Sequence, residues 1–168
     1  MQDEIITLVD KNNQIIGATP RSKMRFGVDF HRATYILVFD KNQHLLVQKR
    51  TLNKSFCPGY YGIATGGVVA SGESYIESAH RELQEELGFD AELADHGLFY
   101  TEGNSFRIWG NLYSCHYDES LHGPLRLQAD EVASIHTMSM ADIMDNPNQL
   151  LFTPDTLDAL KHYVNKND

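Results

Sequence analysis

The segment from Gly66 to Phe89 constrains the fold more than any other part of the chain. Ser74 stands three residues before Glu77, which is the spacing of a capping box at the start of a helix. Gly88 suits the left-handed conformation that ends many helices. The segment therefore predicts a helix from about Ser74 to Leu87. The pair of glycines before it allows the backbone to approach other groups closely.

Side chains three or four positions apart share a face of a helix, so the faces of this segment can be assigned. The apolar face is formed by Ile76, Ala79, Leu83 and Leu87. Beside it, Glu82, Glu85 and Glu86 stand at positions i, i+3 and i+4. The spacing predicts three carboxylates close together at the edge of the buried surface.

A solvated acidic face is the simplest interpretation of such a cluster. However, two carboxylates about 5 Å apart repel by roughly 3 kcal/mol at an effective dielectric of about 20, and by less if fully exposed. A hard divalent cation removes this repulsion, because Mg2+ prefers carboxylate oxygens, keeps several waters and bridges to substrate phosphates. The carbonyls of Gly66 and Gly67 are candidate neutral ligands, although the pair also fits a tight bend after a strand. The pattern favours a metal site.

The fixed residues of the segment follow the spacing G-x5-E-x7-R-E-L-x-E-E-x-G-F. They are Gly67, Glu73, Arg81, Glu82, Glu85, Glu86 and Gly88. In this pattern the chain resembles the Nudix hydrolase superfamily at every fixed position. The resemblance implies that Glu82, Glu85 and Glu86 bind the metal, and that the backbone carbonyl of Gly67 completes the coordination shell.

The resemblance also implies a reaction. Glu85 is expected to bind metal or to position the attacking water, so Glu82 and Glu85 are the predicted catalytic residues. Glu73 and Arg81 are expected to pair and to support the loop against the helix. The cofactor is expected to be Mg2+ or Mn2+, which would neutralise phosphate oxygens and activate water. The implied function is hydrolysis of a diphosphate bond in a small nucleotide-derived or other diphosphate-linked substrate.

Outside this segment the chain resembles isopentenyl-diphosphate isomerase and its hydrolase-like relatives. The shared phrases are LVDKNNQIIGATPR at the N-terminus, His31-Arg32-Ala33, LLVQKRT at 45 to 51 and PGYYGIATGGV at 58 to 68. In the isomerase pattern, a cysteine stands at the position of Thr65 and a metal-binding histidine at that of Gly67. Without these two residues, the resemblance predicts the scaffold rather than the isomerase reaction. An isoprenoid-diphosphate isomerase and a non-catalytic nucleotide-binding module remain the alternative functions.

Composition limits the domain organisation and the partners. A chain of 168 residues with 42% hydrophobic residues suits one domain, predicted to span 1–168. The formal net charge of −9 argues against a nucleic acid polymer or an anionic membrane as partner. The N-terminus lacks a basic region followed by an apolar core, so a cytoplasmic protein is expected. A homodimer is expected only by analogy, since homodimers are common in the superfamily.

The remaining pattern alternates strands with a few helices. Strands are predicted at 4–9, 14–18, 33–39, 44–48, 60–69, 93–102, 106–117 and 132–138. A short helix is predicted after Ser139, and a terminal helix from Thr153 to about Asn165. The first two strands form a hairpin. This order fits an α/β protein, and the resemblance specifies a Nudix α/β/α sandwich with a mixed β-sheet, preceded by the N-terminal hairpin.

Further residues are candidates for the substrate site. Arg50 and Arg32 are predicted to contact substrate phosphate, with exposed strand-end arginines as the alternative interpretation. Either Asp130 or Glu131 is a candidate for an additional acid that binds metal or water. In the strand 106–117, the face that carries Trp109 is the one expected to line a cleft.

Overall fold

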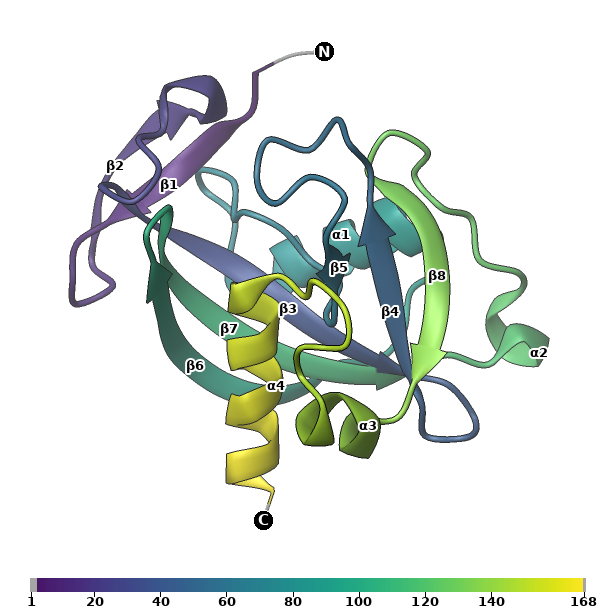
Figure 1. The fold of residues 1–168 in the computed structure, drawn as a ribbon. Helices are drawn as coiled ribbons and strands as arrows, with labels where there is room; N and C mark the ends of the chain where they lie inside the picture. Colours follow the sequence, from purple (N-terminus) through teal and green to yellow (C-terminus); the bar gives the residue numbers. More distant parts are fainter. Residues whose placement is uncertain (1–2, 168) are drawn as a thin grey trace.

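A mixed eight-stranded sheet forms the centre of the computed structural model, which describes residues 3–167 (Figure 1). The strands are β1 Ile5–Val9, β2 Ile15–Pro20, β3 Phe30–Phe39, β4 Leu45–Arg50, β5 Tyr61–Gly62, β6 Ala94–Gly103, β7 Phe106–His116 and β8 Val132–Met138. The helices are α1 Tyr75–Leu87, α2 Glu119–His122, α3 Met140–Asp145 and α4 Pro154–Lys166, and a short 3-10 helix, η1, spans Arg21–Lys23. The predicted N-terminal hairpin is confirmed, because β1 and β2 pair antiparallel.

The sheet divides where β3 and β4 separate. The two strands pair only at Phe39 and Leu45, next to the turn that joins them, and then diverge (Figure 1). On one side of this division, β3 pairs in parallel with β7, and β7 pairs antiparallel with β6. On the other side, β4 lies between β5 and β8, both antiparallel to it. The divergence leaves room for a pocket between the two halves.

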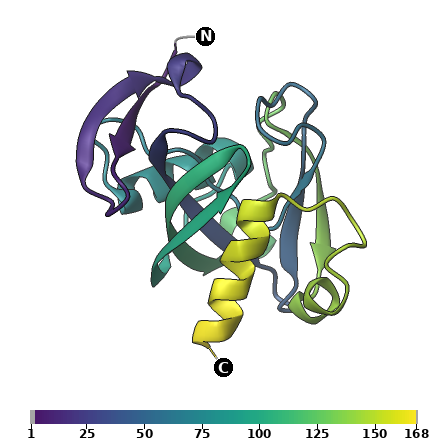
Figure 2. The same cartoon turned by 60° about the vertical axis from the view of Figure 1, so that its left-hand side comes forward.

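Helices cover both faces of the sheet (Figures 1 and 2). The alternation of side chains along β3 explains both layers, because Tyr35 and Leu37 pack toward α4 while Ile36 and Val38 pack toward α1. In the second layer, Leu83 of α1 is fully buried. This arrangement confirms the predicted α/β class with a mixed sheet between helices.

Helix α1 has the predicted ends. The Ser74 hydroxyl accepts a hydrogen bond from the Glu77 amide at 3.2 Å, the Glu77 carboxylate accepts one from the Ser74 amide, and Gly88 has a φ of 79°. The predicted apolar face is wrong at one end, since Ile76 is 41% exposed and Ser78 is buried in its place. The buried face is therefore rotated toward the side of the helix that carries Glu82 and Glu86.

The predicted strand at 60–69 is wrong in extent. Only Tyr61–Gly62 forms a strand, and the chain beyond it makes isolated bridges to β3, such as Thr65 with Ile36 and Val68 with Ala33. Gly66 interrupts the extended conformation with a φ of 142°, and a Cβ atom there would lie 2.0 Å from the carbonyl oxygen of Thr34. The segment thus crosses tightly beside β3 and leads into α1.

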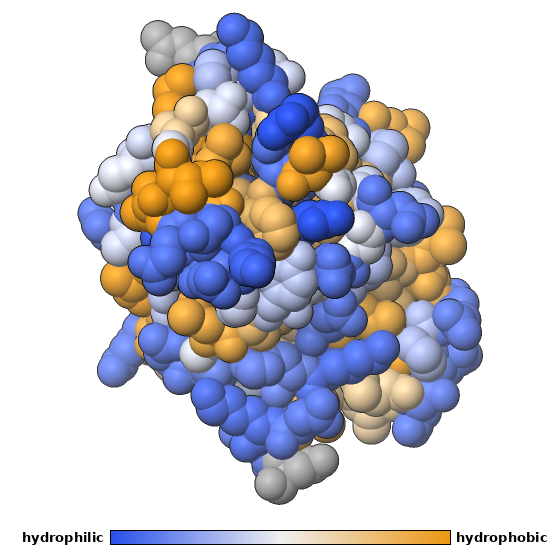
Figure 3. Space-filling model, turned by 90° about the vertical axis from the view of Figure 1, so that its left-hand side faces the viewer, coloured by the Kyte–Doolittle hydropathy of each residue, from blue (hydrophilic) through white to orange (hydrophobic). Residues whose placement is uncertain are grey.

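Two further features were not predicted. Helix α2 is a single turn, which no periodic pattern indicated. Strand β2 is at the edge of the sheet and exposes Ile15 and Ile16. Figure 3 shows the face on that side, where hydrophobic and hydrophilic residues are interspersed. Among residues 3–167, no helix is long and apolar enough to cross a membrane.

Candidate active site

An acidic cavity of about 230 Å³ lies between α1 and the turn that precedes it. Helix α1 contributes Glu82, Glu85 and Glu86, and the turn contributes Gly66 and Gly67. The three glutamates predicted to share a face therefore line one cavity together with the glycine pair. Side chains three or four positions apart lie on the same face of a helix. The three carboxylates therefore all project from the edge of the buried face of α1 toward the turn.

Gly67 allows the Glu82 carboxylate to approach the backbone. A Cβ atom on Gly67 would lie 2.6 Å from Oε1 of Glu82, a separation that side-chain carbons essentially never show. The Gly67 carbonyl accepts a hydrogen bond from the Thr34 amide at 2.9 Å, which fixes the turn against β3. The Thr34 hydroxyl also donates to this carbonyl, at the longer distance of 3.4 Å, and this second acceptor position is the one that a metal ligand would take.

Of the three carboxylates, Glu86 is buried and Glu82 is largely buried, with a side chain that is 12% exposed. Glu86 is 6% exposed, and its Oε2 accepts hydrogen bonds from Gln48 Nε2 at 3.2 Å and from the Gly66 amide at 3.4 Å. Burial raises the pKa of Glu86. Burial and the nearby charge of Glu86 raise the pKa of Glu82 to about 8. The positive charges of Arg81 near Glu82 and of Lys54 near Glu86 oppose this increase but do not cancel it.

Arg81 connects the carboxylates to the turn. Its Nε and Nη2 donate to the two oxygens of Glu73 at 2.7 and 2.9 Å, which is a bidentate pair. Its Nη1 donates to Glu82 at 2.9 Å and to Glu85 at 3.2 Å. Glu73 also accepts from the Ala70 amide at 3.1 Å. The expected contact between Glu73 and Arg81 is present, and the pKa of Arg81 is raised chiefly by its bond to Glu73.

The donor set fits a hard divalent cation. Within residues 3–167, no three His, Cys, Asp or Glu side chains are arranged to hold one ion by themselves. Glu85 differs from Glu82 in its exposure, since its side chain is 47% exposed and that of Glu82 is 12% exposed. Mg2+ needs only one or two carboxylates, since substrate phosphates and waters complete its shell. Glu82 and Glu86 are the carboxylates placed to hold such an ion, and the Gly67 carbonyl lies nearby.

The two arginines predicted to bind phosphate lie in different places, and only Arg50 lines the pocket next to the cavity. Arg50 lines the pocket next to the cavity, where its Nε and Nη2 donate to the Phe56 carbonyl at 3.1 and 2.8 Å. Arg32 is not among the residues that line the cavity or this pocket. Its guanidinium donates to Asn13 at 2.8 Å and lies over the ring of Tyr75, because alternation along β3 turns it toward α1.

Two other cations line both the cavity and the pocket. Lys54 comes from the loop after β4, and Arg21 comes from η1 of the N-terminal hairpin. Lys54 forms an ion pair with Glu131, which also lines the cavity. Of the two candidate acids after α2, the structure therefore brings Glu131 to the cavity, whereas Asp130 contributes a carbonyl to Thr51 at 2.7 Å.

The pocket beside the cavity has apolar walls. Its residues include Phe106 and Ile108 from β7, and His31 and Tyr35 from β3. The prediction that the opposite face of β7 lines the cleft is wrong, because Trp109 packs against Tyr100 with ring centroids 5.2 Å apart. Burial lowers the pKa of His31 to about 4, so its ring is neutral near pH 7.

Comparison with known proteins identifies the family. The NUDIX domain family matches residues 29–159. The chain belongs to the Nudix family. An uncharacterised Nudix hydrolase from Yersinia pestis is 42% identical over 166 residues, which cover 98% of this chain and 88% of the relative. The Nudix hydrolase YfcD of Escherichia coli K12 is 41% identical over 165 residues, which cover 98% and 88% of the two chains.

Solved Nudix structures have the same fold. DR0079 from Deinococcus radiodurans superposes with a TM-score of 0.78 at 18% identity, covering 94% of this chain and 98% of that one. The NUDIX domain of Shewanella oneidensis NrtR, solved with ADP ribose, superposes with a TM-score of 0.63 at 15% identity, covering 89% and 94%. The chain is thus an enzyme of the Nudix hydrolase type. The resemblance to the isomerase branch stays a prediction.

Sequence reasoning missed part of this Nudix site. Gln48, which holds Glu86, stands in the phrase LLVQKRT as a polar residue within an apolar strand, and that position was a usable signal. Lys54 and Arg21 lie in turns, where isolated basic residues are common and carry no signal. They reach the cavity only because the loop after β4 and the N-terminal hairpin fold over the same end of the sheet.

Proposed function

We propose that this Nudix chain is a divalent-metal-dependent hydrolase that cleaves a diphosphate bond in a small nucleotide-derived or other diphosphate-linked molecule. One observation carries the proposal: Glu82 and Glu86 are buried beside one cavity, and burial raises the pKa of both carboxyls. A bound Mg2+ or Mn2+ reverses that disadvantage, since it favours the ionised carboxylates.

The metal would be held by Glu82, Glu86 and the carbonyl of Gly67. When bound, it supplies charge neutralisation at the phosphate oxygens and activates water. Glu85, held by Arg81 at 3.2 Å, orients the attacking water and accepts its proton. The water oxygen bonds to phosphorus while the bridging P–O bond breaks, and the departing phosphate keeps the electron pair. Glu131 is a further candidate to hold metal or water in this cavity.

The cations at the junction of the cavity and the pocket suit the anionic substrate. Lys54 and Arg21 line both spaces, and Arg50 lines the pocket. In an acidic protein of net charge −9, these side chains offset the repulsion between the protein and a diphosphate. We assign substrate phosphate binding to Lys54, Arg21 and Arg50. The position of Arg32 assigns it to packing between the hairpin and α1.

The test is hydrolysis of a panel of diphosphates by the wild type and by Glu86→Gln, with Mg2+ and Mn2+ and with EDTA. The panel includes ADP ribose, nucleotide sugars, dinucleotides, nucleoside triphosphates and isopentenyl diphosphate. Glu92→Gln is the matched control, because Glu92 is exposed and lies outside the cavity. We expect metal-dependent phosphate release that falls by 100-fold or more in Glu86→Gln only, a loss of about 3 kcal/mol of transition-state stabilisation.

Two results would contradict the proposal. Unchanged turnover in Glu86→Gln, with metal present, would show that this carboxylate does not support catalysis. Tight binding of a panel compound without phosphate release would favour the non-catalytic module, and double-bond migration in isopentenyl diphosphate would favour the isomerase. A homodimer also stays a prediction, which sedimentation of the purified protein tests.

A further inference from the structure

The pocket beside the acidic cavity is placed to hold the part of the substrate that is not phosphate, an inference that rests on the proposed function. The two spaces share Lys54, Arg21, Gly66 and Gly67, so they are continuous. A diphosphate bound at the glutamates of α1 therefore directs its attached group into the pocket. The pocket measures about 100 Å³ and is narrower than the cavity.

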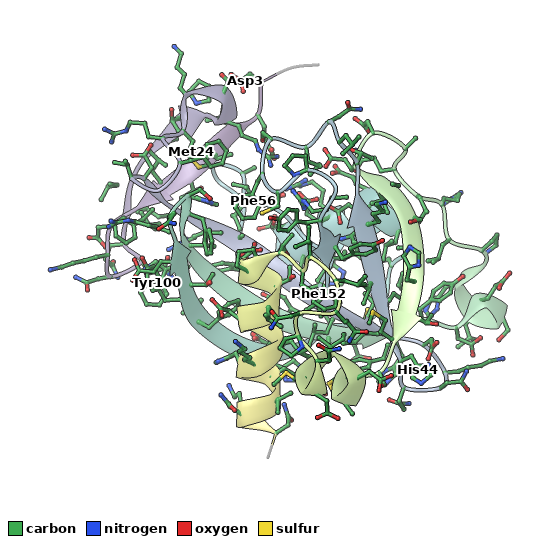
Figure 4. All side chains as sticks on the ribbon, in the orientation of Figure 1. Asp3, Met24, His44, Phe56, Tyr100 and Phe152 are labelled. Atoms are coloured by element: carbon green, nitrogen blue, oxygen red, sulfur yellow. The ribbon has the colours of Figure 1, made fainter. Side chains whose placement is uncertain are left out.

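The walls of the pocket suit a flat group. Phe56 and Phe106 stand edge to face with ring centroids 5.6 Å apart, and Met24 adds a flexible apolar side chain. Figure 4 shows Phe56 above the first turn of α4, and Met24 on the side of the N-terminal hairpin. Aromatic rings in this arrangement favour stacked or edge contacts with another planar ring.

Two buried oxygens of the pocket lack a hydrogen-bond partner. Asp155, in the first turn of α4, is 9% exposed, and its Oδ1 accepts no hydrogen bond from the described residues. Gln48 is 6% exposed, and its Oε1 is likewise without a partner in that part of the chain. Both residues line the pocket. Such oxygens are usually paired with protein or water, so each is an acceptor position that a ligand donor can take.

Among the described residues, only one of the two carboxylate oxygens of Asp155 has a hydrogen-bond donor. Its Oδ2 accepts from the Tyr35 hydroxyl at 2.9 Å, which orients the carboxylate. A position at the start of α4 favours a negative charge, but it does not satisfy Oδ1. Thr153, Thr156 and Arg50 favour the ionised carboxylate, although burial outweighs them and raises the pKa of Asp155; Arg50 donates to the Phe56 carbonyl, and no hydrogen bond from the described residues reaches Oδ1.

The amide of Gln48 has a defined orientation. Its Nε2 donates to the Ala64 carbonyl at 3.3 Å, to Thr65 Oγ1 at 3.1 Å and to Glu86 Oε2 at 3.2 Å. The Ala64 carbonyl and the ionised Glu86 carboxylate can only accept, so the nitrogen faces them and the oxygen faces away. The pocket therefore offers two acceptors and requires donors from its ligand.

We propose that Asp155 is a specificity-determining residue that accepts a hydrogen bond from an amino group on a planar heterocycle, with Gln48 as a second acceptor. A diphosphate joined to such a ring satisfies the aromatic walls and the unpaired oxygens together. An alkyl diphosphate would leave both oxygens unpaired, and a site built to pair a donor discriminates strongly against a ligand that lacks it.

The test compares ligands that differ by the amino group. Binding of nucleoside 5′-monophosphates is measured by calorimetry with Mg2+ in three pairs: AMP against purine riboside monophosphate, GMP against IMP, and CMP against UMP. Monophosphates have no anhydride bond, so the measurement does not depend on turnover. We expect the wild type to bind the amino-bearing member of at least one pair about tenfold more tightly or better.

Two variants locate the effect. Asp155→Asn keeps an acceptor for Tyr35 and places a donor at the other position, so the preference should fall to about one. Asp158→Asn is the control, because Asp158 lies one turn later on α4 and bonds to Thr101 outside the pocket. It should keep the wild-type preference.

The inference fails if the wild type binds all three pairs within twofold, or binds none of them. It also fails if a folded Asp155→Asn keeps the preference. The comparison within the wild type stands even if that variant does not fold. Phosphate release from the diphosphate panel tests the proposed function independently of these binding measurements. An active hydrolase without a preference for the amino group would overturn only the assignment of Asp155.

Discussion

Glu82→Gln should change how the stability of the metal-free protein depends on pH. Burial and the charge of Glu86 raise the pKa of Glu82 in the folded state to about 8, from an ordinary value of 4.5. Between these two pH values the folded state holds a proton that the unfolded state has released. The contribution of Glu82 to stability is therefore complete below pH 4.5 and is lost as the pH rises toward 8.

The size of this change in stability follows from the difference between the pKa values of Glu82 in the unfolded and folded states. Each pH unit corresponds to about 1.4 kcal/mol, so the free energy of unfolding should fall by about 3 kcal/mol between pH 4.5 and pH 7 through Glu82 and its interaction with Glu86. The Glu82 side chain is 12% exposed, so solvent screens this effect little. A glutamine at this position does not titrate, and the variant should lose this part of the pH dependence.

The assay is urea unfolding in EDTA at pH 5 and pH 7, with Glu92→Gln as an exposed control. We expect the difference in unfolding free energy between wild type and Glu82→Gln to change by about 2 kcal/mol over this interval, in favour of the variant at pH 7. Added Mg2+ should stabilise the wild type more than the variant, because only the wild type gains an ionised ligand. A difference that stays constant within about 0.5 kcal/mol would refute the buried-carboxyl argument.

Three further perturbations test other parts of the site. Gly67→Ala should reduce activity by tenfold or more while the protein still folds, because the Cβ atom of the alanine would lie 2.6 Å from the Glu82 carboxylate. A wild-type kcat/KM in this variant would contradict the prediction. Burial and the charge of Arg50 lower the pKa of Lys54 to about 8, so KM should rise between pH 7 and 9 as Lys54 loses its positive charge. This rise in KM should be absent in Lys54→Arg. Gly88→Ala should lower the unfolding free energy by about 1 to 3 kcal/mol in urea, because φ is 79° and the new Cβ atom meets the Arg126 side chain at 2.7 Å.

Local signals in the sequence were sufficient for α1 and for the approximate positions of most strands. The capping box at Ser74 and the stop at Gly88 act within one helix, so their prediction needs no knowledge of the tertiary fold. Likewise, Asp10 and Asp40 each begin a polar turn and accept hydrogen bonds from amides two and four residues later. Such features depend on neighbours in the sequence, and the structure has them where they were predicted.

Features that depend on distant contacts were missed or misplaced. The parallel pairing of β3 with β7 joins strands about 75 residues apart, and only this pairing decides which face of β7 meets the pocket. Without it, the face of Trp109 was indistinguishable from the face of Phe106. The predicted strand at 60–69 was too long for a similar reason, because the chain beyond Gly62 makes only isolated bridges to β3, a strand that is distant in sequence.

The site therefore has two parts with different origins. The part proposed to bind metal is encoded in one stretch of sequence, from the glycine pair through α1, and it lies within the region that matches the Nudix family. The pocket proposed to hold the rest of the substrate is assembled from the N-terminal hairpin, the loop after β4 and α4, which meet where β3 and β4 diverge. Arg21 lies outside the matched region altogether. Because these segments are separate from α1, substitutions in them can change which substrate is bound while the metal site stays intact.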